Sequence, residues 1–149
     1  TISRIHRRLY DPSSIERPVG QYLKELCTDL LDATGAQNIV CLVDTPPLRF
    51  DLTQLTTLSL LVVEVVTNAL KHAFPDGRRG TITIQLEQLD AERLQLVIAD
   101  DGRGMPADFD PDATRSLGFR IAQGLAGQLG GQLTYSNEGG TVVRLAFTP

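Results

Sequence analysis

Apolar residues recur at intervals of three and four positions in four segments of the chain, a period that predicts amphipathic helices. These segments are residues 1–10, 17–33, 51–73 and 116–129. The third is the longest, and Asp51 and Gln54 at its start have the spacing of a capping box. Its predicted buried face contains Leu55, Leu58, Val62, Val65, Val66 and Ala69.

Elsewhere apolar and polar positions alternate, which predicts strands at residues 38–44, 81–89, 93–99, 132–136 and 141–147. Short turns, at Asp90-Ala91 and at residues 137–140, join the last four strands into two hairpins. An all-parallel sheet would need a crossover between its strands, so the hairpins argue against one. We therefore expect an α+β fold, a two-layer sandwich in which a mixed, mainly antiparallel sheet packs against three helices.

A length of 149 residues with 42% hydrophobic content fits one compact domain. The net charge of −4 gives no reason to expect nucleic acid as a partner. Cys27 and Cys41 belong to no metal-binding or CxxC pattern, so we expect both to be buried thiols in a reducing, cytoplasmic compartment. We recognise no signal peptide and no apolar run of the roughly 20 residues that span a membrane. Because the chain begins at Thr1, we expect it to be part of a longer protein.

Glu64, Asn68 and His72 are spaced by four in the longest helix and form one polar row, with Lys71 beside it. Such a row is often only the solvated edge of a helix. This one borders the apolar face, so we expect it to line a seam between helix and sheet. An amide oxygen suits Mg²⁺, a carboxylate can orient metal-bound water or accept a proton, and the two basic side chains can donate to phosphate oxygens.

A second polar element, Asp100-Asp101-Gly102-Arg103-Gly104, follows the strand at residues 93–99. The simplest interpretation is a turn, because Asp and Gly are common in turns. The element nevertheless leaves a buried strand toward the same seam. A carboxylate there could accept a hydrogen bond from an adenine amino group, and the glycines would allow close approach.

Two further glycine-containing elements and one histidine are candidates for a functional role. Leu117-Gly118-Phe119-Arg120 opens the last helix, where free backbone N–H groups could bind phosphate. Gly139-Gly140-Thr141 is most simply a hairpin turn. We interpret His6 as a surface histidine rather than a phosphorylated one, because no carboxylate follows within the next turn to act as a base.

In this order the four elements resemble the catalytic ATP-binding domain of sensor histidine kinases, part of the gyrase, Hsp90, histidine kinase and MutL superfamily with the Bergerat fold. Residues 64–72 resemble the N box, 100–104 the G1 box, 117–120 the G2 box and 139–141 the final glycine element. The resemblance covers residues 18–149, and residues 1–17 resemble the end of the dimerisation helices that precede such a domain.

The resemblance implies an Mg·ATP-binding kinase domain that transfers the γ-phosphoryl group of ATP to a histidine on the preceding dimerisation domain. Asn68 would coordinate Mg²⁺, Glu64 would lie by its hydration shell, and Asp100 would bind the adenine amino group. It assigns catalysis to Glu64, Lys71 and His72, and nucleotide binding to Asn68, Asp100, Gly102, Gly104, Met105, Leu117, Gly118 and Thr141. The implied partners are a response regulator and a second copy of the full-length protein.

Three details refine the resemblance. The short lid at residues 105–116 and the Lys-His-Ala-Phe run after the N box resemble a subgroup allied to HWE-type kinases, although the chain has no Trp and lacks the HWE signature itself. Ser116 stands where many relatives have the first glycine of the G2 box. The segment that carries the phospho-accepting histidine is missing from this sequence.

Three other functions fit the same elements. A water-directed ATPase would use Glu64 as its general base. An anti-sigma-type serine kinase shares the fold but stands alone, without a dimerisation segment like residues 1–17. A nucleotide-binding module without chemistry would retain the fold, although Glu64, Asn68 and Asp100 argue against it.

Overall fold

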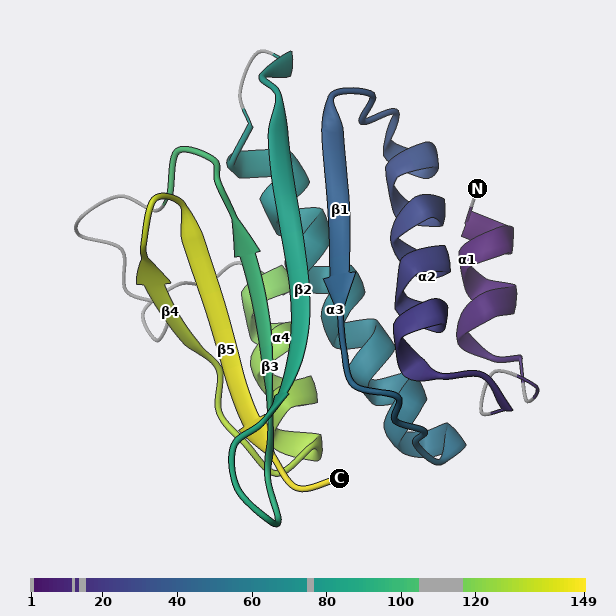
Figure 1. The fold of residues 1–149 in the computed structure, drawn as a ribbon. Helices are drawn as coiled ribbons and strands as arrows, with labels where there is room; N and C mark the ends of the chain where they lie inside the picture. The colour runs from purple at the N-terminus through teal and green to yellow at the C-terminus, as the bar shows by residue number, and fades with distance from the viewer. Residues whose placement is uncertain (1, 12, 14–15, 75–76, 105–116) are drawn as a thin grey trace.

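The computed structural model describes the chain except residues 1, 12, 14–15, 75–76 and 105–116 (Figure 1). In chain order the elements are α1 (Ile2–Leu9), α2 (Val19–Thr34), β1 (Ile39–Asp44), α3 (Leu52–His72), β2 (Gly80–Gln88), β3 (Leu94–Asp100), α4 (Leu117–Gln128), β4 (Thr134–Asn137) and β5 (Thr141–Phe147). Each predicted element is present, with boundaries that differ from the predicted ones by at most two residues.

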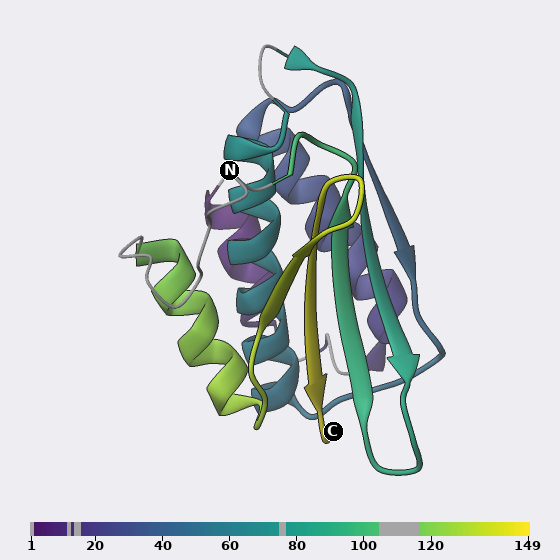
Figure 2. The same ribbon diagram turned by 90° about the vertical axis from the view of Figure 1, so that its left-hand side faces the viewer.

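The five strands form one sheet in the order β1-β2-β3-β5-β4. Strand β1 pairs in parallel with β2, and the other neighbours pair antiparallel. Helix α3 supplies the crossover that a parallel pair requires. Figure 2 shows the resulting layers, with α2, α3 and α4 on one face of the sheet. The predicted α+β sandwich with a mixed sheet is therefore confirmed.

The core lies between the sheet and the helices. Alternate residues of three central strands point toward the helices and are 5% exposed or less: Ile82, Ile84, Leu86, Leu94, Leu96, Ile98, Val143, Leu145 and Phe147. Helix α3 contributes Leu58, Leu61 and Val62, which are fully buried. Burying one such side chain contributes about 1.5–3 kcal/mol, so the two hydrophobic periods read from the sequence specify how the layers pack.

Helix α3 is the central helix of this layer. With 21 residues and a hydropathy of 1.3 in its most apolar window, it is long and apolar enough to cross a membrane by length and composition. The prediction that no segment reaches this limit was therefore wrong. The same apolar side chains form the domain core, where α3 packs against α2, α4 and the sheet.

The start of α3 forms half of the predicted capping box. The Asp51 carboxylate accepts a hydrogen bond from the Gln54 backbone N–H at 2.8 Å. The Gln54 side chain does not return to Asp51. It donates instead to the carbonyl of Thr148 at 3.3 Å, so it ties the start of the helix to the end of the chain.

A cluster of ion pairs holds α1 against α2, which Figure 1 shows side by side. The Asp29 side chain is 6% exposed and pairs with Arg4 at 3.2 Å and with Arg8 at 2.5 Å. Glu25 pairs with Arg8 at 2.8 Å and with Arg17 at 2.5 Å. Arg4, Arg8 and Arg17 thus form ion pairs with acidic residues of α2. The predicted domain boundary at residue 17 stays a prediction.

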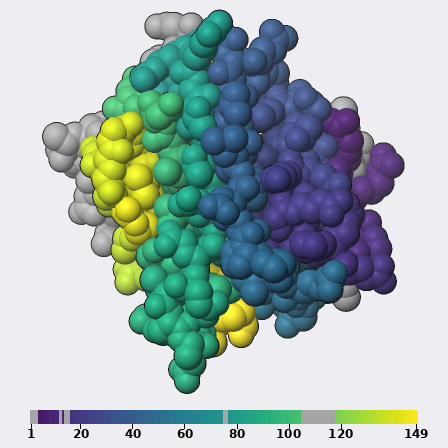
Figure 3. Space-filling view, viewed as in Figure 1, coloured from purple at the N-terminus to yellow at the C-terminus, as the bar shows by residue number. Residues whose placement is uncertain are grey.

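On the other face of the sheet, no helix of the described residues covers the strands, and Figure 3 shows β1, β2 and β5 at the surface. Val40 and Leu42 of β1 are 55% and 54% exposed there. Cys41 lies between them, packs against the core and is half-buried, whereas Cys27 of α2 is buried. The prediction of two buried thiols holds for Cys27 and was wrong for Cys41.

Candidate functional site

The polar row on α3 meets the start of α4. Glu64 and Asn68 are half-buried. A Cβ atom added at Gly118 would lie 3.2 Å from Asn68 Oδ1 and 3.4 Å from Glu64 Oε2. The row therefore faces the start of α4 at this point, while the predicted seam with the sheet stays a prediction. Only a residue without a side chain leaves the two polar groups undisturbed.

The end of the row is open to solvent. Lys71 and His72 are exposed in the last turn of α3. Within the described part of the chain, neither side chain makes a hydrogen bond or an ion pair. The positive charge of Lys71 suits a helix C-terminus, where the unpaired carbonyl groups carry partial negative charge. Both are accessible to a ligand, but the structure does not bring them into contact with Glu64 or Asn68.

Asp100 is the last residue of β3, and one of its oxygens is fixed by the backbone. Oδ1 accepts hydrogen bonds from the Gly102 N–H at 2.9 Å and the Thr141 N–H at 3.2 Å. No described residue donates to Oδ2. The neighbouring Asp101 is hydrogen-bonded to the sheet, because its carboxylate accepts from the Thr81 N–H at 2.8 Å. Of the two acids, Asp100 is the one with an oxygen left for a ligand.

Two glycines allow this arrangement. A Cβ atom at Gly140 would collide with the Asp100 carbonyl and lie 3.0 Å from its carboxylate, and the Gly140 φ of 140° suits glycine. A Cβ atom at Gly102 would collide with the carbonyl of Ala73, which accepts a hydrogen bond from the Arg103 N–H at 3.0 Å. The loop after β3 is thus fastened to the residue that ends α3.

Sequence reasoning missed two of these contributors. Ala73 carries no polar side-chain group, so nothing in the sequence indicates that its backbone carbonyl binds the loop after Asp100. Gly140 was assigned to a hairpin turn and, by resemblance, to the final glycine element, but its contact with Asp100 was not predicted. In the structure this turn packs against Asp100 as well as closing the hairpin.

The structure describes two of the remaining predicted residues. Gly104 has a φ of 75°, and a Cβ atom there would lie 2.8 Å from Asn137 Oδ1 at the end of β4. Leu117 begins α4. Met105 and Ser116 lie outside the described residues, as does the whole predicted lid.

The donor set limits how a metal could bind. The described residues contain no group of three or more His, Cys, Asp and Glu side chains that could hold a metal ion. Glu64 and Asn68 supply one carboxylate and one amide. Mg²⁺ commonly keeps several waters and is bound by one or two protein oxygens together with substrate phosphates. The pair therefore fits Mg²⁺ carried by a phosphate ligand and does not fit a metal held by protein alone.

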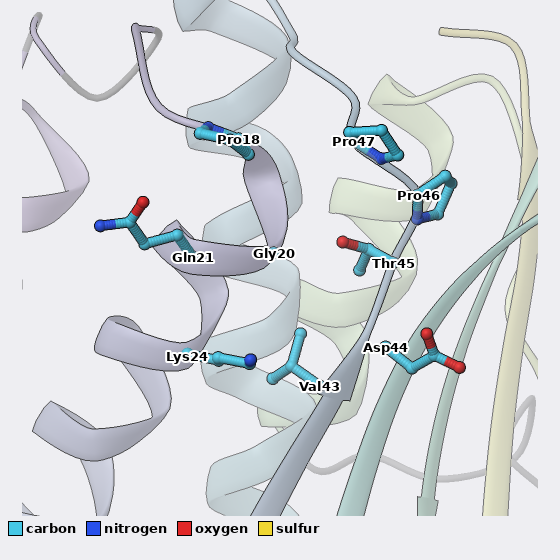
Figure 4. Close-up of a pocket in the computed structure, with 9 residues that line it drawn as sticks. All are labelled: Pro18, Gly20, Gln21, Lys24, Val43, Asp44, Thr45, Pro46 and Pro47. Carbon is cyan, nitrogen blue, oxygen red and sulfur yellow. The ribbon is translucent and has the colours of Figure 1, made fainter.

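A separate hollow lies at the other end of the molecule. It has a volume of about 460 Å³ between the N-terminal turns of α2 and the segment after β1, and Figure 4 shows Lys24 and Thr45 among its lining residues. It shares no residue with the predicted site. The hollow is therefore separate from the polar row and the Asp100 loop.

Comparison with known proteins identifies the fold. Residues 53–149 match the profile of the family described as histidine kinase-, DNA gyrase B-, and HSP90-like ATPase. A blue-light-activated histidine kinase of Erythrobacter litoralis is 34% identical over 131 residues, which cover 86% of this chain and 37% of that protein. The sensor histidine kinase PdtaS of Mycobacterium tuberculosis is 39% identical over 80 residues, 52% of this chain and 16% of that protein.

A solved structure gives the same answer. The histidine kinase domain of an Erythrobacter litoralis blue-light-activated histidine kinase superposes with a TM-score of 0.83 and 29% identity, over 97% of this chain and 71% of that one. The chain spans between a sixth and two fifths of the length of the curated kinases named above. The family match covers the polar row, the Asp100 loop and the glycine turn together. The chain therefore belongs to the family of histidine kinase-, DNA gyrase B- and HSP90-like ATPases, and its similarity is to the catalytic domains of histidine kinases.

Proposed function

We propose that this chain is the Mg·ATP-binding catalytic domain of a sensor histidine kinase. It would transfer the γ-phosphoryl group of ATP to a histidine on a dimerisation domain that precedes it in the longer protein. The observation that carries the proposal is the pair of half-sites joined at Ala73. One half is Glu64 and Asn68 against Gly118, and the other is Asp100 with one oxygen left for a ligand.

Asp100 would bind the adenine end of the nucleotide. Because Oδ1 is occupied by two backbone N–H groups, Oδ2 is the oxygen that can accept from an adenine amino group. A hydrogen bond to a charged acceptor contributes about 1.5–3 kcal/mol. Gly102 and Gly104 allow the loop to pack closely against Ala73 and Asn137, because a Cβ atom at either glycine would crowd those residues.

Asn68 and Glu64 would serve the phosphate end. The Asn68 amide oxygen would bind Mg²⁺ that bridges the phosphates, and Glu64 would hold a water of its hydration shell. When bound, the metal would neutralise charge that develops on the phosphoryl group. Lys71, His72 and the N-terminal N–H groups of α4 from Leu117 would donate to phosphate oxygens. Thr141 would hold Asp100 in place through its backbone N–H.

The phosphoryl transfer requires no nucleophile from this domain. The bond between the γ-phosphorus and the bridging oxygen breaks, ADP leaves, and a ring nitrogen of the acceptor histidine forms the new bond to phosphorus as its proton departs. Catalysis of this kind rests mostly on positioning and charge neutralisation. A phospho-accepting histidine, a second copy of the chain and a response regulator are the partners this reaction requires, and we infer a cytoplasmic location for the domain.

The adenine contact is tested by Asp100→Asn. The two backbone N–H donors should hold the amide oxygen at the Oδ1 position and turn the amide NH₂ toward the ligand. Calorimetry should then show about 10- to 100-fold weaker Mg·ADP binding. Mg·IDP has an acceptor where ADP has a donor, so it should lose less affinity or gain some. Asp101→Asn is the matched control and should change the affinity for neither ligand, because the Asp101 carboxylate accepts from the Thr81 N–H.

The metal contact is tested by Asn68→Ala, which should weaken Mg·ADP far more than adenosine. Wild-type affinity for Mg·ADP in both Asn68→Ala and Asp100→Asn would show the proposal to be wrong. Transfer to a histidine is measured with the longer protein and radiolabelled ATP, as an acid-labile phosphoryl group on the dimerisation segment. Steady ATP hydrolysis by this chain alone, abolished in Glu64→Gln, would favour a water-directed ATPase instead.

A further inference from the structure

The only two cysteines of the sequence meet across the seam between α2 and β1. Strand β1 alternates between faces, so that Ile39, Cys41 and Val43 pack toward the core while Val40 and Leu42 face outward. Cys27 lies on the buried face of α2, which packs against β1. Both thiols therefore lie on the inward faces of two elements that pack against each other.

The two thiols differ in exposure and acidity. Cys27 is 2% exposed, whereas Cys41 is half-buried and so partly open to solvent. The neighbouring thiol of Cys27 lowers the pKa of Cys41 below the usual range of a thiol, because it stabilises the thiolate. The neighbouring Cys41, together with burial, raises the pKa of Cys27. Reactive cysteines combine accessibility with thiolate character and often lie beside a second thiol.

The hollow in Figure 4 opens into the same seam. Its lining includes Lys24, one turn before Cys27 on α2, and Val43, the next inward residue after Cys41 on β1. Figure 4 shows the Lys24 side chain extending toward Val43. The hollow therefore ends at residues that adjoin the two cysteines on both elements, and the positive charge of Lys24 lies there.

We propose that Cys27 and Cys41 form a thiol–disulfide pair in which Cys41 reacts first with a peroxide-class oxidant and Cys27 resolves the product. The Cys41 thiolate attacks a peroxide oxygen, the O–O bond breaks, and Cys41 becomes a sulfenic acid as hydroxide leaves and takes a proton. The Cys27 sulfur then attacks the Cys41 sulfur, the S–O bond breaks, and water leaves with the proton of the Cys27 thiol. In total, two thiols and one hydrogen peroxide give one disulfide and two waters.

The disulfide would fasten α2 to the edge of the sheet. Helix α2 also holds α1 through the ion pairs of Asp29 and Glu25, so the bond would tie the whole N-terminal helix pair to β1. Nucleotide binding should be unaffected, because no residue of the predicted nucleotide site lines this seam. The redox pair and the proposed kinase function can therefore fail independently.

The experiment treats the folded chain with hydrogen peroxide and follows free thiols and intact mass. We expect loss of both titratable thiols, a monomer lighter by two hydrogen atoms, and a peptide map that joins Cys27 to Cys41. Dithiothreitol should restore both thiols. The oxidised chain should melt at a higher temperature, because the cross-link restricts the unfolded chain. Mg·ADP affinity should be equal in the two redox forms.

Single variants assign the roles. In Cys27→Ala, Cys41 should stop at a sulfenic acid that dimedone traps, and in Cys41→Ala the buried Cys27 should react at least about tenfold more slowly. Wild-type protein alone also tests the proposal, by comparison of the folded chain with the chain in urea. Two thiols that persist in the folded chain under peroxide that oxidises the unfolded chain would overturn it. So would oxidation that yields only disulfide-linked dimers.

Discussion

Gly118→Ala separates the function of the site from the stability of the fold. The new methyl group would lie 3.2 Å from Asn68 Oδ1 and 3.4 Å from Glu64 Oε2. The first distance is shorter than an ordinary carbon–oxygen contact, so the Asn68 amide must move by a few tenths of an ångström. Gly124→Ala is the matched control, because it lies in the same helix and a Cβ atom there meets nothing within 4 Å.

The two variants should have opposite profiles. Alanine in place of glycine inside a helix stabilises it by about 1 kcal/mol, so Gly124→Ala should raise the free energy of unfolding by up to that amount. At Gly118 the gain is smaller because the residue lies in the first helical turn, and crowding offsets it. If Asn68 binds the metal and phosphates, its displacement should cost about 1.4 kcal/mol of affinity, which is a tenfold change in Kd.

Urea unfolding and calorimetry with Mg·ADP check both numbers on the same samples. Gly118→Ala should bind Mg·ADP about tenfold more weakly than wild type at nearly unchanged stability, and Gly124→Ala should bind it as wild type does. Adenosine, which has no phosphates, should bind all three proteins alike. If Gly118→Ala and Gly124→Ala bind Mg·ADP with equal affinity, the assignment of Asn68 to the phosphate end is refuted.

Two further predictions concern the rest of the domain. Asp29→Ala should lower the free energy of unfolding by about 3 kcal/mol in urea titrations, since it removes a buried partner of two arginines; the exposed Asp32→Ala should cost at most about 1 kcal/mol. The pKa of Glu138 is lowered from 4.5 to about 2 by hydrogen bonds from Arg144 and Ser136. Its carboxylate therefore stabilises the β4–β5 turn above pH 4.5, and the contribution is lost as the pH falls toward 2. An NMR titration of the Glu138 side chain should give a pKa near 2 in the wild type and a higher one in Arg144→Ala, where only the Ser136 hydrogen bond remains.

The elements were predictable because their signals are local. A period of two or of three to four residues is written in consecutive side chains, and Asp51 marked the start of α3 as it does in the structure. The sequence also singled out Glu64, Asn68 and Asp100 as candidates, and their functional roles stay predictions. A resemblance in the order of four motifs added the fold, which the comparisons confirm.

The partners of these elements were not predictable, because contacts between distant residues leave no period in the sequence. The sequence did not show how closely the polar row approaches the start of α4. The Gln54 amide reaches Thr148 instead of Asp51. The mean hydropathy of α3 was underestimated. Its Thr, Asn and Glu residues interrupt the run of apolar residues, but the mean hydropathy of its most apolar window stays high. Each error concerns which surface an element meets, and none concerns whether the element exists.

The contact between Gly102 and Ala73 joins the two halves of the candidate site. Glu64 and Asn68 belong to a helix, whereas Asp100 belongs to a strand that pairs with β2 and β5. The Arg103 N–H bond to the Ala73 carbonyl fastens the loop after Asp100 to the end of that helix, and the absence of a side chain at Gly102 permits the approach. If the two halves bind the adenine and phosphate ends of a nucleotide as proposed, this contact between backbone groups helps to set their separation before the ligand binds.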